Sequence, residues 1–459
     1  MKKILRAIVP LAALMGAAWL LFSPATILSV QEKKAAALAL VTISFWATGI
    51  IPEHLTSLLF FLLAMLFSLA PAAVVFSGFT STAIWLVFGG LVMGIAISTT
   101  GLGTRIADLS AAGLRGSYPR IICGLTAAGV CFSLLMPSAM GRVVLLGPIV
   151  LSLADHFGFP QGSRGRTGIV LAAVLGTFIP AFGILPANVP NMILAGMAET
   201  QYDITLLYGP YLLLHFPLLT AVKAVLLAGL IILFHADTPR EKTGTASRDK
   251  QPMTRQERIL AVVIALMLLL WMTDFLHHVS PAWIALGGAL FLLFPGVEIV
   301  GKKQFNQKIN WASLFFIAGI LGLGGLINHS GLGRCLAQRL IALLPLAPHH
   351  AFVNFLSMGT ASMFTGLATT LPGIPAVMTP LADTVASTTE LPVTSILMMQ
   401  VLGFSTVLLP YQAPPIVIGM QMAGEKFSAA AKVCLALAAI TLLLLLPLDF
   451  LWWRLLGYL

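Results

Sequence analysis

The stretch CFSLLMPSAMGRVVLLGP, residues 131–148, is apolar enough for a lipid bilayer but carries helix breakers at its centre. Pro137, Ser138 and Gly141 interrupt the helical pattern, and Arg142 follows Ser138 by one turn. Proline lacks a backbone N–H and glycine weakens a helix interior, so the stretch predicts two helical arms joined at a turn. An arginine beside such a turn at membrane depth indicates a functional position.

The composition of the whole chain is that of an integral membrane protein. Of its 459 residues, 58% are hydrophobic and 9% are charged, and the mean hydropathy is +0.97. Soluble domains carry about 25% charged residues. Because one crossing needs about 20 apolar residues, the chain has room for roughly ten to twelve spans. The net charge of +10 is spread over short loops, so it indicates topology and not nucleic-acid binding.

We predict an all-α polytopic membrane fold with about 11 transmembrane helices and two re-entrant hairpins. One transmembrane helix at 1–32 precedes a first five-helix repeat at 33–234, which contains a hairpin at 118–155. A cytoplasmic loop at 235–257 leads to a second repeat at 258–459, with a hairpin at 350–388. The first helix is followed by Ser23-Pro24-Ala25, which imitates a signal-peptide cleavage site, but the many later spans favour an uncleaved helix.

Two sequence matches at nearly one offset indicate the internal repeat. IWLVFGGLVMGIAISTTGLGTRIA at 84–107 realigns with LFFIAGILGLGGLINHSGLGRCLA at 314–337, an offset of 230 residues. LPANVP at 185–190 matches LPYQAP at 409–414, an offset of 224 residues. Each repeat has an odd number of crossings, so the second copy is expected to insert upside down relative to the first. Inverted repeats of this kind are the architecture of many secondary transporters.

The distribution of basic residues predicts the orientation. With a cytoplasmic N-terminus, most of the 26 Lys and Arg residues fall on the cytoplasmic side, as the positive-inside rule requires. The C-terminus is then expected outside. Arg142 and Lys223 are left at membrane depth, where each costs roughly 2.5–3.5 kcal/mol to insert.

Helix breaks recur in two pairs, around Pro137-Ser138 and 186–190 in the first repeat and around 369–375 and 410–415 in the second. Non-helical backbone at membrane depth is tolerated only when it is buried in protein or lines a watery cavity. Helix N-termini at such breaks suit an anion, and freed carbonyls suit a small cation such as sodium. One kink would be structural, but breaks in symmetric pairs favour a binding site.

The residues at these breaks are our candidate site. We predict that the substrate is bound by Ser138, Ala139, Arg142, Asn188, Thr369, Thr370 and Gln412. Residues that open the helices or bind a coupling ion are Ser133, Pro186, Pro190, Asn191, Pro410, Ala413 and Pro414. We predict no catalytic residue, because no acid/base set is clustered. We predict no metal site, because the four cysteines lack CxxC or His spacing.

The two basic residues at membrane depth have different interpretations. A guanidinium can bind a carboxylate or sulfate bidentately, so Arg142 is predicted to face an anionic substrate. The alternative is that Arg142 ties down the hairpin or reaches the cytoplasmic face. Lys223 has no break near it, and we predict that it pairs helices.

With these motifs in hand, the chain resembles the divalent anion:sodium symporters of the ion transporter superfamily. The resemblance rests on FWATGIIPEHLTSLL at 45–59, the Gly-rich helix at 84–107, a hairpin ending in Gly147-Pro148, and LPANVPN at 185–191. It implies two re-entrant hairpins, a dicarboxylate, citrate or sulfate-like substrate at their tips, sodium coupling, homodimers and elevator-type movement. The family's Ser-Asn-Thr tip motif reads Ser138-Ala139-Met140 here, so the chain is a divergent member.

We therefore predict a secondary active transporter, a symporter or exchanger of small divalent anions, in a bacterial inner or plasma membrane. It is not predicted to be an enzyme or to bind nucleic acid or a cofactor. The coupling ion stays open between Na⁺, H⁺ and a counter-substrate. We expect Arg142 to supply the positive charge that sodium would otherwise bring. The alternative is a cation/proton antiporter on the same scaffold, which needs buried carboxylates; Asp155 and Asp383 lie near the hairpin ends instead.

Overall fold

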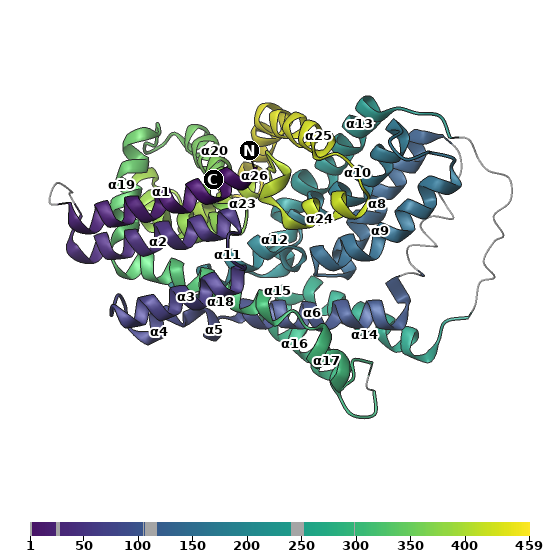
Figure 1. Cartoon of the computed structure of the whole chain (residues 1–459), viewed down its shortest axis with the longest axis horizontal. Helices are drawn as coiled ribbons and strands as arrows, with labels where there is room; N and C mark the ends of the chain where they lie inside the picture. Colours follow the sequence, from purple (N-terminus) through teal and green to yellow (C-terminus); the bar gives the residue numbers. More distant parts are fainter. Residues whose placement is uncertain (1, 24–27, 104, 106–116, 240–251, 298) are drawn as a thin grey trace.

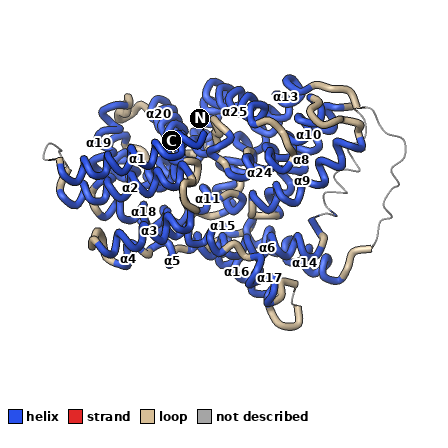
Figure 2. Tube along the Cα trace, viewed as in Figure 1, coloured by secondary structure: helices blue, strands red, loops and turns tan. Residues whose placement is uncertain are grey.

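The computed structural model is all-helical in the residues that it describes, which are all except 1, 24–27, 104, 106–116, 240–251 and 298 (Figure 2). Seven helices within this part of the chain are long and apolar enough to cross a membrane. The predicted all-α polytopic membrane fold is confirmed, while the number of crossings and the inversion of the repeat stay predictions. The cleavage-like Pro24-Ala25 and most of the predicted cytoplasmic loop lie outside the described residues.

The first half of the chain is a succession of helices. It consists of α1 (Lys2–Phe22), α2 (Val30–Thr48), α3 (Glu53–Leu66), the short α4 (Ala72–Val75) and α5 (Ser77–Thr80), and α6 (Thr82–Thr100). After residues 106–116 come α8 (Tyr118–Leu135), α9 (Ala139–His156), α10 (Arg164–Phe178) and α11 (Val189–Tyr202). A long last helix is made of α12 (Tyr208–His215), a π-helical segment (Phe216–Val222) and α13 (Lys223–His235).

The second half has the corresponding order. It begins with α14 (Arg255–Met272), α15 (Asp274–His277), α16 (Pro281–Leu293), α17 (Lys302–Lys308), α18 (Trp311–His329) and α19 (Leu332–Leu343). The second broken stretch is α20 (Ala351–Thr369), α21 (Gly373–Met378) and α22 (Ala382–Thr389). The chain ends with α23 (Val393–Phe404), α24 (Pro414–Met422), α25 (Phe427–Ile440), a second π-helical segment (Thr441–Leu445) and α26 (Leu446–Leu455).

The segments that match in sequence also share local backbone geometry. Gly101 (φ 82°, ψ 0°) and Gly331 (φ 82°, ψ −7°) are both left-handed, a conformation that favours glycine, and each follows a Gly-rich helix. The two LPx motifs each form one turn of 3₁₀-helix, Leu185–Ala187 and Pro410–Gln412. Each turn is followed by a new α-helix, because the second proline of each motif fits the first turn of a helix.

Packing crosses between the two halves. Helix α9, which follows the first hairpin break, packs on α24, and α21, which follows the second hairpin break, packs on α11. Helix α10 lies between α8, α9, α13 and α24, and Figure 1 shows the yellow α24 against the blue α9 and α10. The rings of Phe182 and Phe404, whose centroids are 5.7 Å apart, join the two interrupted helices. The helices that begin at the breaks of one half thus pack against helices of the other half.

Polar contacts join loops that the charge pattern assigned to one side of the membrane. Arg105 Nε lies 3.0 Å from Glu257 Oε1, although the two residues are far apart in sequence. The backbone N–H of Gly165 donates to Asp237 Oδ2 over 2.9 Å. These contacts agree with the predicted layout, in which both pairs are cytoplasmic, and the orientation itself stays a prediction.

Candidate half-sites at the four helix breaks

The first hairpin breaks between α8 and α9. Met136 has extended backbone (φ −125°, ψ 105°), and Ser138 caps α9 by accepting a hydrogen bond from the Gly141 N–H over 3.1 Å. Pro137 cannot donate a backbone hydrogen bond, so the helix cannot continue through it. The break leaves the Met136 carbonyl free of helical bonding, and Arg142 Nη1 donates to this oxygen over 2.5 Å.

The guanidinium of Arg142 is completely buried and connects this break to the interrupted helix α10–α11. Its Nε and Nη2 donate to the Thr177 carbonyl over 3.2 and 2.9 Å. Nη1 also donates to the Ala187 carbonyl over 3.1 Å, and Nη2 donates to Asn188 Oδ1 over 3.4 Å. A guanidinium has five N–H groups, so in this conformation every one of them has an acceptor in the chain.

The oxygens around Arg142 are available because prolines interrupt α10–α11. The α-helix ends at Phe178 and the chain turns into the 3₁₀ segment Pro180–Gly183, since Pro180 cannot donate a helical hydrogen bond. At this helix end the Thr177 carbonyl accepts from Arg142 and from the Ser133 hydroxyl, 3.1 Å away. The amide nitrogen of Asn188 donates to the Phe178 carbonyl, and that of Asn191 donates to the carbonyls of Phe182 and Ile184. The side chains thus satisfy the backbone that the break exposes.

The second hairpin breaks at Thr370. Its φ of +73° and ψ of 166° lie in a region that is essentially restricted to glycine, and a β-branched residue there is strained by about 1–3 kcal/mol. The next N–H, that of Leu371, donates to the Gln412 carbonyl over 3.3 Å. The Thr369 hydroxyl lies 3.0 Å from the carbonyl oxygens of Thr365 and Thr370. Strain held at a helix break is typical of a functional position.

Gln412 takes the central place in this second half-site. Its Oε1 accepts the backbone N–H groups of Leu408 and Leu409, each over 2.8 Å. Its Nε2 is buried and has no hydrogen-bond partner among the described residues. A buried, unused N–H donor is costly unless a ligand or water satisfies it.

The structure thus brings the predicted residues together in two groups. Ser138, Arg142 and Asn188 share one group, with Ser133 beside them, and Thr369, Thr370 and Gln412 form the other. Ala139 begins α9, Pro190 lies at the start of α11 and Pro414 at the start of α24, whereas Pro186 and Pro410 lie in the 3₁₀ turns and Ala413 precedes α24. Their roles in binding substrate or ion stay predictions.

The two groups differ in charge. The arginine is in one copy only, because the positions opposite it are Gly373 and Ile374. The N-termini of α9, α11 and α24 start at the breaks and add partial positive charge. The arrangement is therefore electropositive on one side and neutral, with one free amide donor, on the other.

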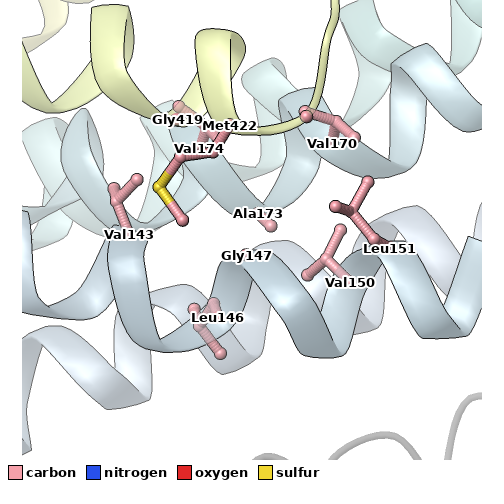
Figure 3. Close-up of a pocket in the computed structure, with 11 residues that line it drawn as sticks. Val143, Leu146, Gly147, Val150, Leu151, Val170, Ala173, Val174, Gly419 and Met422 are labelled. Carbon is pink, nitrogen blue, oxygen red and sulfur yellow. The ribbon is translucent and has the colours of Figure 1, made fainter.

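An apolar pocket lies next to the first group, between α9, α10 and α24 (Figure 3). Val143, Val150 and Val174 line it, and the Met422 side chain hangs across it from α24. It has no polar side chain to hold an anion, so we assign no substrate to it. It marks a packing gap at the contact between the two halves.

Two features of the site are not apparent in the sequence. The main partners of Arg142 are backbone carbonyls, which no side-chain motif identifies; the only hint was Pro180, three residues after Thr177. Asp449, a fully buried carboxylate, was likewise not among the predicted site residues. Asp155, in contrast, forms an ion pair with Arg166, and its side chain is 65% exposed.

Comparison with known proteins gives matches over the whole chain. The family model described as the sodium:sulfate symporter transmembrane region matches residues 1–459. A membrane protein of Cupriavidus necator is 26% identical over 395 residues, which cover 83% of this chain and 76% of that protein. An L-tartrate/succinate antiporter of Escherichia coli is 25% identical, covering 74% of this chain and 72% of that protein.

A further relative and a solved structure also match this chain. The sodium-dependent dicarboxylate transporter SdcS of Staphylococcus saprophyticus is 24% identical over 72% of this chain and 68% of that protein. Among solved structures, the YdaH transporter of Alcanivorax borkumensis aligns with 100% of this chain and 99% of its own, at a TM-score of 0.54 and 15% identity. At that identity the structural match concerns the fold alone.

Proposed function

The chain belongs to the sodium:sulfate symporter family, and from this premise we propose that it is a secondary active transporter, a symporter or exchanger, of small divalent anions with a built-in cation at its first half-site. The family is one of symporters, and the tartrate/succinate antiporter and SdcS are transporters, so the chain is a membrane transporter and not an enzyme. The resemblance to divalent anion:sodium symporters is thereby confirmed.

The observation that carries the proposal is the set of oxygens around Arg142. Three carbonyls and one side-chain amide oxygen, contributed by the hairpin break and by the interrupted helix, all point at one buried positive charge. Freed carbonyls at broken helices are typical ligands for a transported sodium ion. In this chain a guanidinium occupies that environment, so the charge is covalently attached and does not arrive with the substrate.

A fixed charge and three helix N-termini favour a dianion near the breaks. A buried positive charge is expensive in a bilayer unless an opposite charge or polar groups compensate it. The oxygens of the chain satisfy the hydrogen bonds of Arg142, and dicarboxylates, tartrate and sulfate-like anions would add the opposite charge. The free Gln412 Nε2 offers a hydrogen-bond donor to the same ligand from the second half-site. We propose that Ser138, Asn188, Thr369 and Thr370 contact the anion when the site is open to it.

The remaining parts of the proposal concern assembly and movement. They are elevator-type alternating access, a homodimer, and an inner-membrane location with a cytoplasmic N-terminus and an external C-terminus. The cation/proton antiporter alternative would need a cation-binding carboxylate at the breaks, and Asp155 is instead paired with Arg166.

The test is transport by the purified protein in lipid vesicles. Uptake of labelled succinate, L-tartrate and sulfate is measured in sodium medium and in medium where potassium replaces sodium. We expect saturable uptake of at least one dianion, with equal rates in the two media. A steep dependence on sodium would refute the built-in cation, and absence of transport for all three anions, together with cation flux, would refute anion transport.

A further inference from the structure

A second cluster of buried ionisable groups lies away from Arg142, where the last helices of the two halves meet. Lys223 is 1% exposed in the middle of the 28-residue apolar helix Tyr208–His235, and Asp449 and His215 are completely buried. Lys223 and Asp449 are close enough to interact electrostatically. Asp449 lies in the apolar helix Phe427–Leu455. Ionisable groups inside membrane helices mark ion or proton pathways by default.

The hydrogen bonds of Lys223 show which group in the cluster carries the positive charge. Its Nζ lies 2.8 Å from the Ser405 carbonyl, 3.3 Å from Ser405 Oγ and 3.4 Å from Thr406 Oγ1. Both hydroxyls use their own hydrogens on the Leu402 carbonyl. The amine must therefore donate three times, and only the ammonium form has three N–H groups. Lys223 is a fixed cation in this conformation.

Asp449 has less polar compensation than Lys223. Both of its carboxyl oxygens are buried without a hydrogen-bond partner among the described residues, and so are the Trp453 indole N–H and both ring nitrogens of His215. A charged carboxylate in this setting is stabilised only by the electrostatic attraction of Lys223 and by the nearby Trp453 side chain, whereas the protonated form avoids most of the desolvation cost. The carboxyl group is the member of the pair that can gain and lose a proton.

The cluster is connected to the second half-site through α23. Ser405 is the C-terminal cap of α23, and its carbonyl is the strongest partner of Lys223. Three residues later the chain enters the break, where Leu408 and Leu409 donate to Gln412. Both helices of the cluster contain a π-helical segment, Phe216–Val222 before Lys223 and Thr441–Leu445 before Asp449. Such segments occur frequently at functional sites.

We propose that Asp449, facing the ammonium of Lys223 behind the second half-site, is a proton-binding site that couples anion transport to proton symport. This inference rests on the proposed transport function and adds its coupling ion. One proton from the solution forms an O–H bond with the Asp449 carboxylate, and the cluster changes from neutral to a net charge of +1. The added positive charge favours a bound dianion, and by linkage the dianion favours the proton. Both are released together on the other side.

Few other titratable groups face this carboxyl group. His215 contacts the Trp453 ring at a centroid distance of 5.7 Å, and Tyr211 contacts His215 at 4.5 Å. Tyr458 follows α26 and contacts Trp453 at 6.1 Å. The neighbouring α20 contains no ionisable side chain, and α25 contributes only a lysine over the Phe234 ring and a buried cysteine. Lys223 is thus the only charged side chain of the described residues that we find facing Asp449.

The test uses the full-length protein in vesicles that contain a pH-sensitive dye, with the membrane potential clamped at zero. We expect inward succinate movement to acidify the lumen. An inward proton gradient of one pH unit should concentrate succinate about tenfold, as one symported proton allows. The Asp449→Asn variant should keep succinate exchange at equal pH but lose both effects, whereas Asp155→Asn, which removes an exposed carboxylate, should keep them.

The measurements separate this inference from the function it rests on. Wild-type protein that exchanges none of succinate, L-tartrate and sulfate overturns the transport proposal, whereas exchange without acidification overturns only the proton site. Proton-driven uptake that persists in Asp449→Asn also overturns it. If that variant fails to fold, the double variant Asp449→Asn/Lys223→Gln removes both charges together, which is tolerated better than removing one. Uncoupled exchange in the double variant supports the site, and coupled exchange refutes it.

Discussion

If Arg142 stands in for a coupling cation, replacing it with a small residue should create a dependence on sodium. The Arg142→Ala variant removes all five N–H groups and leaves three oxygens without a donor, those of Met136, Ala187 and Asn188. The Thr177 carbonyl keeps only the bond from Ser133. The resulting gap is lined by oxygens of the kind that bind small cations.

The size of the effect follows from these contacts. Each buried acceptor left unsatisfied costs about 1–3 kcal/mol, so three of them cost about 3–9 kcal/mol if nothing enters the gap. Native proteins are stable by only about 5–15 kcal/mol, so the variant should be folded but weak in sodium-free medium. A cation that binds only the folded state restores stability, by about 2.7 kcal/mol at 100 times its dissociation constant.

Two assays follow the variant. Thermal unfolding in detergent should show that sodium raises the melting temperature of Arg142→Ala but not that of the wild type. Dianion uptake into vesicles should be lost in potassium medium and partly recovered in sodium medium. The control Arg166→Ala removes an arginine outside the site and should gain no response to sodium. Arg142→Lys keeps the charge and should stay sodium-independent at reduced activity.

Two outcomes would refute this role of Arg142. If sodium changes neither the stability nor the transport of Arg142→Ala, the oxygens around the guanidinium do not form a cation site. If Arg142→Ala also transports at the wild-type rate in potassium medium, Arg142 is only an anchor that ties the hairpin to the interrupted helix.

Three further predictions concern strain, close packing and acid stability. Thr370→Gly should raise the melting temperature, because the backbone at φ +73° favours glycine, and it should reduce transport if the hydroxyl contacts the anion. The control Thr370→Ser keeps the hydroxyl and should keep transport. Equal loss of transport in both variants would exclude a hydroxyl contact. Gly129→Leu should destabilise the α8–α10 contact by about 1–3 kcal/mol or more in thermal unfolding, since a Cβ there would lie 2.7 Å from the Gly176 backbone. Gly229 has open space around it, so the control Gly229→Ala should be neutral. Similar losses of stability in both variants would contradict the close packing of α8 on α10. Glu257, in the first turn of α14 before the apolar run, has its pKa lowered below the usual 4.5, chiefly by hydrogen bonds from Arg105. The contribution of the Glu257 carboxylate to stability is therefore present above pH 4.5 and lost as the pH falls through the lowered pKa. The melting temperature of Glu257→Gln should be below that of the wild type at neutral pH and approach it in acid. A difference in melting temperature that persists in acid would contradict this contribution.

The local features of the fold could be predicted from the sequence because their causes are local. The breaks at Pro137 and Pro186 follow from missing backbone N–H groups, and the left-handed turns at Gly101 and Gly331 follow from residues that favour that conformation. Long apolar runs predict membrane helices from composition alone. The amphipathic α19 was missed, because its 12 residues are too short and too polar to read as a span.

Sequence alone determined that this protein is an all-α membrane transporter with paired helix breaks and an arginine at one of them. Only the tertiary structure decided what the arginine bonds, because its partners are backbone carbonyls of Thr177 and Ala187, 35 and 45 residues away. Carbonyls are present in every residue, so no side-chain pattern identifies the ones that a break sets free. The electrostatic interaction of Lys223 with Asp449 was equally hidden, since it depends on how the last helices of two distant halves pack together.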